Sequence, residues 1–172
     1  MRHNNTNFSV KNILNKTTPF IQGEMDGLCG LYAIANAVRY NDNKNIPIKK
    51  YRSIFETKNL ASIFHQGMDD DEMINHLQRC SKVLGFKYSI LSNVKDIPFI
   101  DVTKNICVII SVEKSNILWD EPHYTVVVGN TSNHYTFYDC LYGHFRVPRE
   151  LFCFKSDKNK VRIFQKNMFL IY

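Results

Sequence analysis

The sequence has no apolar run long enough to cross a membrane. A spanning helix needs about 18 consecutive apolar residues, and no stretch of the 172-residue chain reaches that length. The first twenty residues, MRHNNTNFSVKNILNKTTPF, also lack the apolar segment of a secretory signal. We therefore expect no membrane span, and a location that is cytoplasmic or is reached as an effector without a Sec-type signal.

Paired cysteines are also missing. The chain has five cysteines, an odd number, and no two of them have the C-x-x-C spacing that is typical of structural zinc sites. Without a secretion signal, an odd count argues against a disulfide framework. The acidic run MDDDE, at residues 68–72, suits the start of a helix better than it suits a cation. We expect no metal and no cofactor.

The sequence has no strong excess of one charge and no long linker. Its net charge is +6, and the basic residues are scattered apart from the mild clusters KNIPIKKYR and KSDKNKVR. Such a pattern is typical of a solvated surface, so we expect no nucleic-acid partner. A hydrophobic content of 44% is ordinary for a globular protein. We expect a single domain over residues 1–172, with residues 1–20 as a loose arm. The oligomeric state stays open.

Helical spacing dominates the first half of the chain. Apolar residues recur every three or four positions from Leu28 to Arg39, and the remaining positions there are mostly small and apolar. This predicts a central helix, capped by Asp26 or Gly27. Residues 47–67 predict one or two shorter helices that end at Gly67. Residues 68–85 predict a further helix with acidic residues at its start and Gly85 at its end.

Strand patterns dominate the second half. Alternating or continuously apolar segments predict strands in FKYSIL, NICVIISV, HYTVVVGN, HYTFYDC, HFRVP and VRIFQKNMFLIY, and PRELFCF predicts a short helical turn. Helices followed by strands indicate an α+β fold, in which an antiparallel sheet packs on the central helix.

Cys29 lies where the loop EMDG becomes the predicted central helix. A helix N-terminus favours the thiolate, which is the nucleophilic form of cysteine. A free cysteine is also a common buried small hydrophobe. Cys29 alone is therefore compatible with either a nucleophile or a structural thiol.

The predicted hairpin HYTVVVGNTSNHYTFYD supplies a base and an acid. A turn centred near residue 131 or 132 pairs His123 with Asp139, Thr125 with Phe137, and Val127 with Tyr135. Opposed residues on neighbouring strands share a face, which brings imidazole and carboxylate within hydrogen-bonding reach. A slip of one residue would send Asp139 to the other face. Cys140 follows Asp139 and is expected to face the opposite way and to be inert.

The chain resembles the papain-like cysteine peptidase superfamily, and is similar above all to compact bacterial double-glycine-leader (bacteriocin-processing) peptidases and effector thiol hydrolases. The resemblance rests on QGEMDGLCGLYAIANAV, HYTVVVGNTSNHYTFYD and GHFRVPRELFCF. It implies a papain-like fold with Cys29 as nucleophile, His123 as general base and Asp139 as its orienting group. It also implies Gln22 as an oxyanion donor. Gln22 lies seven residues before Cys29, where six is usual, and we expect Gly23 and Gly27 to absorb the difference.

A Cys–His–Asp site attacks an acyl carbon and passes through a thioester. The leading hypothesis is a cysteine protease acting on a protein or peptide substrate. Alternatives are a glutamine deamidase or transglutaminase-type effector on the same fold, and a non-catalytic protein-binding module. Trp119 flanks His123 and either shields the site or covers the edge of the core.

Overall fold

The computed structural model describes residues 18–23, 27–42, 45–100 and 105–172. Residues 1–17, most of the predicted loose arm, lie outside this range, as does Asp26. Phe20, at the end of that predicted arm, is held in place. Its N–H donates to Asn36 Oδ1 at 2.7 Å, and Asn36 Nδ2 donates back to the Phe20 carbonyl at 3.1 Å.

The central helix α1 (Cys29–Tyr40) begins at Cys29. Leu28 occupies its N-cap position, not the predicted Asp26 or Gly27, and makes no side-chain cap. Most of the helix is buried, including Ala33, Ala35 and Ala37. Small alanine side chains let the helix axis approach the sheet closely, which explains why the predicted helix is central.

Three further helices lie beside α1 among the described residues: α2 (Ile48–Phe55), α3 (Leu60–Gln66) and α4 (Asp70–Leu84). Gly67 and Gly85 follow α3 and α4 with φ angles of 76° and 75°, the left-handed region that glycine tolerates best. Asp69 and Glu72 form a reciprocal capping box at the start of α4. The acidic run therefore caps a helix, as predicted.

Across the described residues, six strands form one antiparallel sheet in the order β1-β8-β2-β3-β4-β5. Their bounds are β1 (Tyr88–Ser92), β2 (Cys107–Val112), β3 (His123–Asn130), β4 (His134–Asp139), β5 (Gly143–Pro148) and β8 (Asn167–Ile171). The predicted helical turn is the 3-10 helix η2 (Arg149–Leu151), followed by β6 (Phe152–Cys153), which pairs in parallel with β7 (Val161–Arg162). The last predicted strand is therefore split into β7 and β8.

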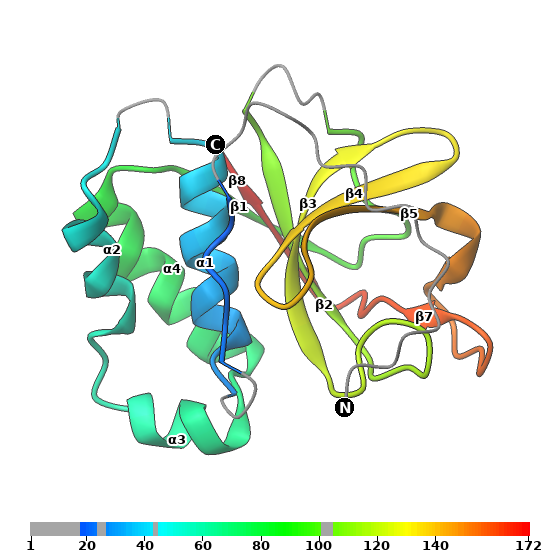
Figure 1. Cartoon of the computed structure of the whole chain (residues 1–172), viewed down its shortest axis with the longest axis horizontal. Helices are drawn as coiled ribbons and strands as arrows, with labels where there is room; N and C mark the ends of the chain where they lie inside the picture. The colour runs from blue at the N-terminus through cyan, green and yellow to red at the C-terminus, as the bar shows by residue number, and fades with distance from the viewer. Residues whose placement is uncertain (1–17, 24–26, 43–44, 101–104) are drawn as a thin grey trace.

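The helices gather on one side of the sheet, with α1 next to it (Figure 1). A first apolar core joins α1, α2 and α4 to Tyr124, Val126 and Val128 of β3. A second core, on the other side, contains Val127, Phe137 and residues of the long loops. Alternate residues of β3 thus face different cores, as a strand buried on both faces requires.

The structure confirms the predicted α+β class and the packing of an N-terminal helix on an antiparallel sheet. Among the helices that the structure describes, none has the length and apolar character needed to cross a membrane.

Candidate functional site

The first turn of α1 presents Cys29 at the edge of the helical layer. Cys29 keeps 9% of its surface exposed. The segment that leads to it is fixed by α3, because the Gly27 N–H donates to the Phe64 carbonyl at 2.9 Å. Since Leu28 has no side chain that can cap the helix, the first N–H groups of α1 keep the positive end of the helix dipole. This is a suitable environment for a developing oxyanion.

The hairpin of β3 and β4 brings His123 and Asp139 together, but by a register that differs from the predicted one. Asn130 pairs with Tyr135, and Val127 pairs with Phe137, not with Tyr135. Three steps along β3 thus match two along β4, so β3 contains a bulge between Val127 and Gly129. Continuing from the Val127 pair, Asp139 lies opposite Thr125, and His123 is its diagonal neighbour.

The bulge preserves the face on which Asp139 lies. If the pairing at Asn130 simply continued, Asp139 would lie opposite Val126, whose side chain belongs to the α1 side of the sheet. One extra residue in β3 returns Asp139 to the face of His123. The prediction of a shared face was therefore right. The predicted partner of Asp139 was wrong by two positions, and the turn is centred between residues 132 and 133, not near 131 or 132.

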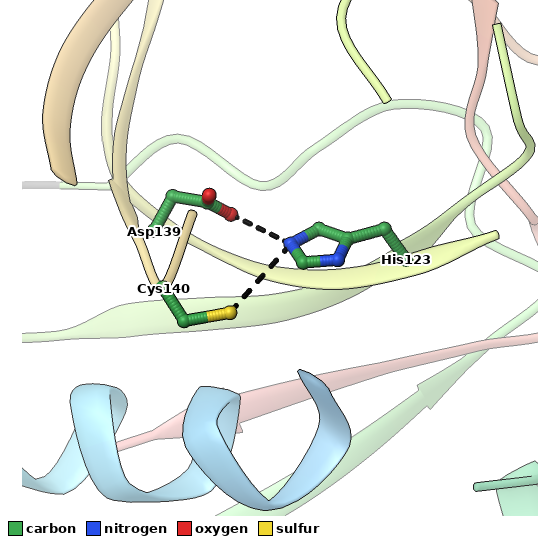
Figure 2. Close-up of side chains that lie close together, drawn as sticks. All are labelled: His123, Asp139 and Cys140. Atoms are coloured by element: carbon green, nitrogen blue, oxygen red, sulfur yellow. Dashed lines mark hydrogen bonds and ion pairs between the residues drawn. The ribbon is translucent and has the colours of Figure 1, made fainter. Parts of the chain in front are cut away.

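His123 and Asp139 form a buried pair. Their exposed fractions are 5% and 1%, and Nε2 of the imidazole lies 2.8 Å from Asp139 Oδ2 (Figure 2). The other carboxylate oxygen, Oδ1, accepts the backbone N–H groups of Leu141 and Tyr142 at 2.8 and 3.0 Å. Three donors thus hold the carboxylate in a fixed orientation behind the ring.

The pair is electrostatically coupled. Burial opposes the charge on His123, but the carboxylate of Asp139 and hydrogen bonding raise the pKa of His123 well above 6.5 overall. Burial likewise opposes the charge on Asp139, yet the imidazole and the backbone N–H of Tyr142 lower the pKa of that carboxyl overall. Near neutral pH the pair is therefore an imidazolium facing a carboxylate.

Trp119 covers one face of the imidazole. Its ring stacks on His123 with centroids 5.5 Å apart and planes 19° apart, and only 1% of its surface is exposed. The preceding residue, Leu118, accepts a hydrogen bond from the Tyr142 hydroxyl. The loop before β3 is thereby tied to the turn after β4. This packing fits both predicted roles of Trp119: it covers the imidazole, and it also belongs to the second core, where it contacts Phe137, Phe145 and Phe152.

Cys29 lies close enough to His123 for its thiol to contribute to the raised pKa of the imidazole. It also adds to the raised pKa values of Tyr124 and Cys140, after the larger effect of burial in each case. The structure thus brings the predicted nucleophile, base and orienting acid into one neighbourhood, although they lie on three separate elements.

Cys140 is the residue that the sequence prediction missed. It packs in the core on the α1 side, as alternation predicts, but β4 ends at Asp139 and Cys140 lies in the turn beyond it. Its sulfur is 3.9 Å from His123 Nε2 (Figure 2). Burial raises the pKa of this thiol to about 11. Cys140 therefore faces the α1 side as predicted, and its raised pKa makes the thiol a poor nucleophile, but the sequence did not indicate that its sulfur contacts the imidazole.

Gln22 lies beside Cys140. Its backbone N–H donates to the Cys140 carbonyl at 2.9 Å, and its side-chain Oε1 accepts a hydrogen bond from the Cys140 thiol at 3.1 Å. Gln22 is therefore at the site, and its oxyanion role stays a prediction. One feature of the sequence could have indicated the contact between Cys140 and His123: Cys140 directly follows Asp139.

The chain matches no known family model and no curated protein.

Proposed function

We propose that the protein is a cysteine hydrolase with a papain-like catalytic arrangement, acting on a protein or peptide through a thioester at Cys29. The observation that carries this proposal is the buried pair of His123 and Asp139, with a helix-terminal thiol beside the imidazole. An imidazolium next to a thiol favours the thiolate, the reactive form.

Each group has a role that follows from its position. Cys29 attacks the acyl carbon, and His123 then returns a proton to the leaving group. Asp139 holds the imidazole in place and compensates its positive charge. The N–H groups at the start of α1, where Leu28 makes no side-chain cap, supply donors for the oxyanion, with Gln22 as a further candidate. Removing one such donor typically lowers turnover by about 10²–10³-fold.

Peptide cleavage is the reaction that we propose first, and the resemblance to double-glycine-leader peptidases supports it. Glutamine deamidation and transglutamination form a thioester with the side-chain carbonyl of glutamine and release ammonia; water then releases the thioester in deamidation, and an amine does so in transglutamination. A location as an effector delivered without a Sec-type signal belongs to the same proposal.

The test is mass spectrometry of a whole-cell protein extract incubated with the wild-type protein, with Cys29→Ala or with Cys80→Ala. Cys80 is a buried thiol of α4 and serves as the matched control. We expect new peptide termini with wild type and Cys80→Ala, and none with Cys29→Ala. Mass changes at glutamine without a cut would indicate deamidation. If Cys29→Ala kept the wild-type products, the mechanism would be wrong.

A second measurement needs no substrate. At about pH 6, well below the usual thiol pKa of about 8.5, iodoacetamide should label Cys29 faster than the other four cysteines. Equally slow labelling of all five would favour a non-catalytic binding module.

A further inference from the structure

Atoms suited to metal binding converge beside the start of α1. His123 Nε2, an Asp139 carboxylate oxygen and Cys140 Sγ all lie within 4.8 Å of one another. Gln22 Oε1 lies 3.1 Å from the same sulfur. Figure 2 shows the three first side chains pointing toward a common point between β3 and the turn after β4. The proposed catalysis uses His123 and Asp139 but has no role for Cys140.

We infer that His123, Asp139, Cys140 and Gln22 bind a zinc ion, and that this ion switches the hydrolase site off. The inhibitory consequence rests on the proposed function. Zinc binding itself does not, because it needs neither Cys29 nor a substrate.

The distances suit a tetrahedral zinc ion after small side-chain movements. Zinc bonds of about 2.3 Å to sulfur and 2.0–2.2 Å to nitrogen or oxygen place neighbouring ligand atoms about 3.3–3.6 Å apart. The observed separations are 2.8 Å between Nε2 and Oδ2, 3.9 Å between Nε2 and Sγ, and 3.1 Å between Sγ and Oε1. Each of these three has to change by only a few tenths of an ångström, whereas the Asp139 oxygen and the Cys140 sulfur, which lie within 4.8 Å of each other, have to approach more closely.

The charge and the chemical type of the ligands also suit zinc. A dication in a buried site has to be neutralised. The Asp139 carboxylate and a Cys140 thiolate supply two negative charges, while imidazole and amide are neutral. A set of sulfur, nitrogen and oxygen ligands favours zinc over magnesium or calcium, which prefer oxygen alone.

The surrounding structure supports the ligands, and the turn that carries Cys140 borders solvent. Two backbone N–H groups hold Asp139 Oδ1 and thereby fix the direction of Oδ2. Hydrogen bonds of this kind, from groups that do not touch the metal, commonly orient the ligands of metal sites. On the solvent side, Gln22 is half-buried, and Leu141 and Tyr142 are 39% and 47% exposed.

Zinc binding and catalysis exclude each other. The metal takes Nε2 of the imidazole and Oδ2 of the carboxylate, the two atoms that form the 2.8 Å pair. The Cys140 thiol proton and the proton between Nε2 and Oδ2 leave to solvent. With the metal on Nε2, His123 can no longer become an imidazolium by taking a proton, and Asp139 no longer orients the ring.

The test uses the full chain, stripped with a chelator and titrated with CoCl2 as a coloured substitute for zinc and then with ZnCl2. We expect one equivalent of cobalt with a thiolate-to-cobalt absorption band, which zinc displaces. Cys140→Ser should lose the band and the stoichiometric binding. Cys29→Ala and Cys80→Ala should keep both.

Circular dichroism checks that each variant folds. Asp139→Asn serves as a second ligand variant, because an amide oxygen can still accept the Leu141 and Tyr142 N–H groups; it should also lose tight binding. An unchanged band in Cys140→Ser, or a band that disappears in Cys29→Ala, would overturn the zinc site. Cys29-dependent cleavage without cobalt binding would remove this inference alone. Cobalt binding through Cys140 without Cys29-dependent chemistry would remove the hydrolase proposal alone.

Discussion

His123 contacts both polar and aromatic groups of the site. It pairs with Asp139, lies 3.9 Å from the Cys140 sulfur and stacks under Trp119. General acid–base groups typically contribute about 10²–10⁴-fold to turnover. We expect His123→Ala to lower turnover by about that range, because no other described group can take the same proton at this position.

Asp139→Asn should lower turnover less than His123→Ala does. Asparagine can still accept the N–H groups of Leu141 and Tyr142 and still contact the ring, but it loses the charge that compensates the imidazolium. The measurement is kcat/KM of both variants on the substrate identified by mass spectrometry. Equal or reversed losses would mean that Asp139 is not the orienting group.

Trp119 is the only tryptophan of the chain, and its stacking on His123 makes it an optical probe of this residue. A protonated imidazole quenches indole fluorescence more than a neutral one. Because the pKa of His123 is raised, the fluorescence of the wild type should increase with a midpoint above pH 6.5. In Asp139→Asn the midpoint should shift to lower pH. The carboxylate charge that raises the pKa of His123 is then absent, while burial, which lowers that pKa, remains.

A wild-type midpoint at or below 6.5, or an unchanged midpoint in Asp139→Asn, would contradict this coupling. Trp119→Phe provides the blank that shows how much of the signal comes from this indole.

Single residues were predictable where the strand pattern decided them. The alternation of β3 and β4 correctly placed His123 and Asp139 on one face. It could not indicate that β4 ends at Asp139 and leaves Cys140 in a turn, because the end of a strand depends on the turn that follows. The contact between Cys140 and Gln22 joins residues 118 positions apart, a separation over which a local pattern carries no information.

At the scale of elements, the approach of α3 to the start of α1 sets the position of Cys29. A Cβ added to Gly27 would lie 2.8 Å from the Ile63 carbonyl oxygen and 2.9 Å from that of Phe64. Both are backbone atoms that cannot turn aside. The loop that leads into Cys29 can approach α3 this closely only with glycine.

We therefore expect Gly27→Ala to move Cys29 and to reduce both turnover and iodoacetamide labelling. A misplacement of about 1 Å can cost about 10²-fold in rate. Gly85→Ala is the matched control. Gly85 has a left-handed backbone at the end of α4, where a non-glycine residue costs about 1–2 kcal/mol of stability. Gly85 lies away from Cys29, so this variant should lose stability and keep its labelling. Wild-type labelling in Gly27→Ala would show that this approach does not position the thiol.

The bulge in β3 was not predictable from the sequence pattern. Val126, Val127 and Val128 are three identical residues in a row, so the pattern gives no reason to choose which of them is the extra one. Burial on both faces made the strand easy to predict and its register hard to predict. The helices were easier, since Asp69 and Gly85 are strong local start and stop signals.

For the whole molecule, the pair of His123 and Asp139 predicts a window of pH in which the fold is most stable. The raised pKa of His123 contributes stability that is complete below about 6.5 and is lost as pH rises through the raised value. The lowered pKa of Asp139 contributes stability that is complete above 3.8 and is lost as pH falls through the lowered value.

The difference in unfolding free energy between wild type and Asp139→Asn should therefore be largest between about pH 4 and 6.5. It should decrease on both sides of this window. Urea denaturation of both proteins across this pH range provides the measurement. A difference that kept growing above pH 7 would mean that His123 is neutral in the folded protein.

The α+β class was predictable because helix and strand periods occupy separate halves of the sequence. The strand order was not, since it depends on pairing between distant segments. The position of β8 is the main example: the last strand of the chain lies between β1 and β2, and no local pattern indicates this insertion.

That position of β8 has a consequence for biosynthesis. β1 pairs only with β8 among the described strands, at residues 167–171, so a nascent chain holds β1 without a neighbour until those residues have left the ribosome. β1 can join the rest of the sheet only after residues 167–171 have been synthesised. A premature stop codon that removed as little as the final strand would leave β1 detached, even though Cys29, His123 and Asp139 had all been synthesised.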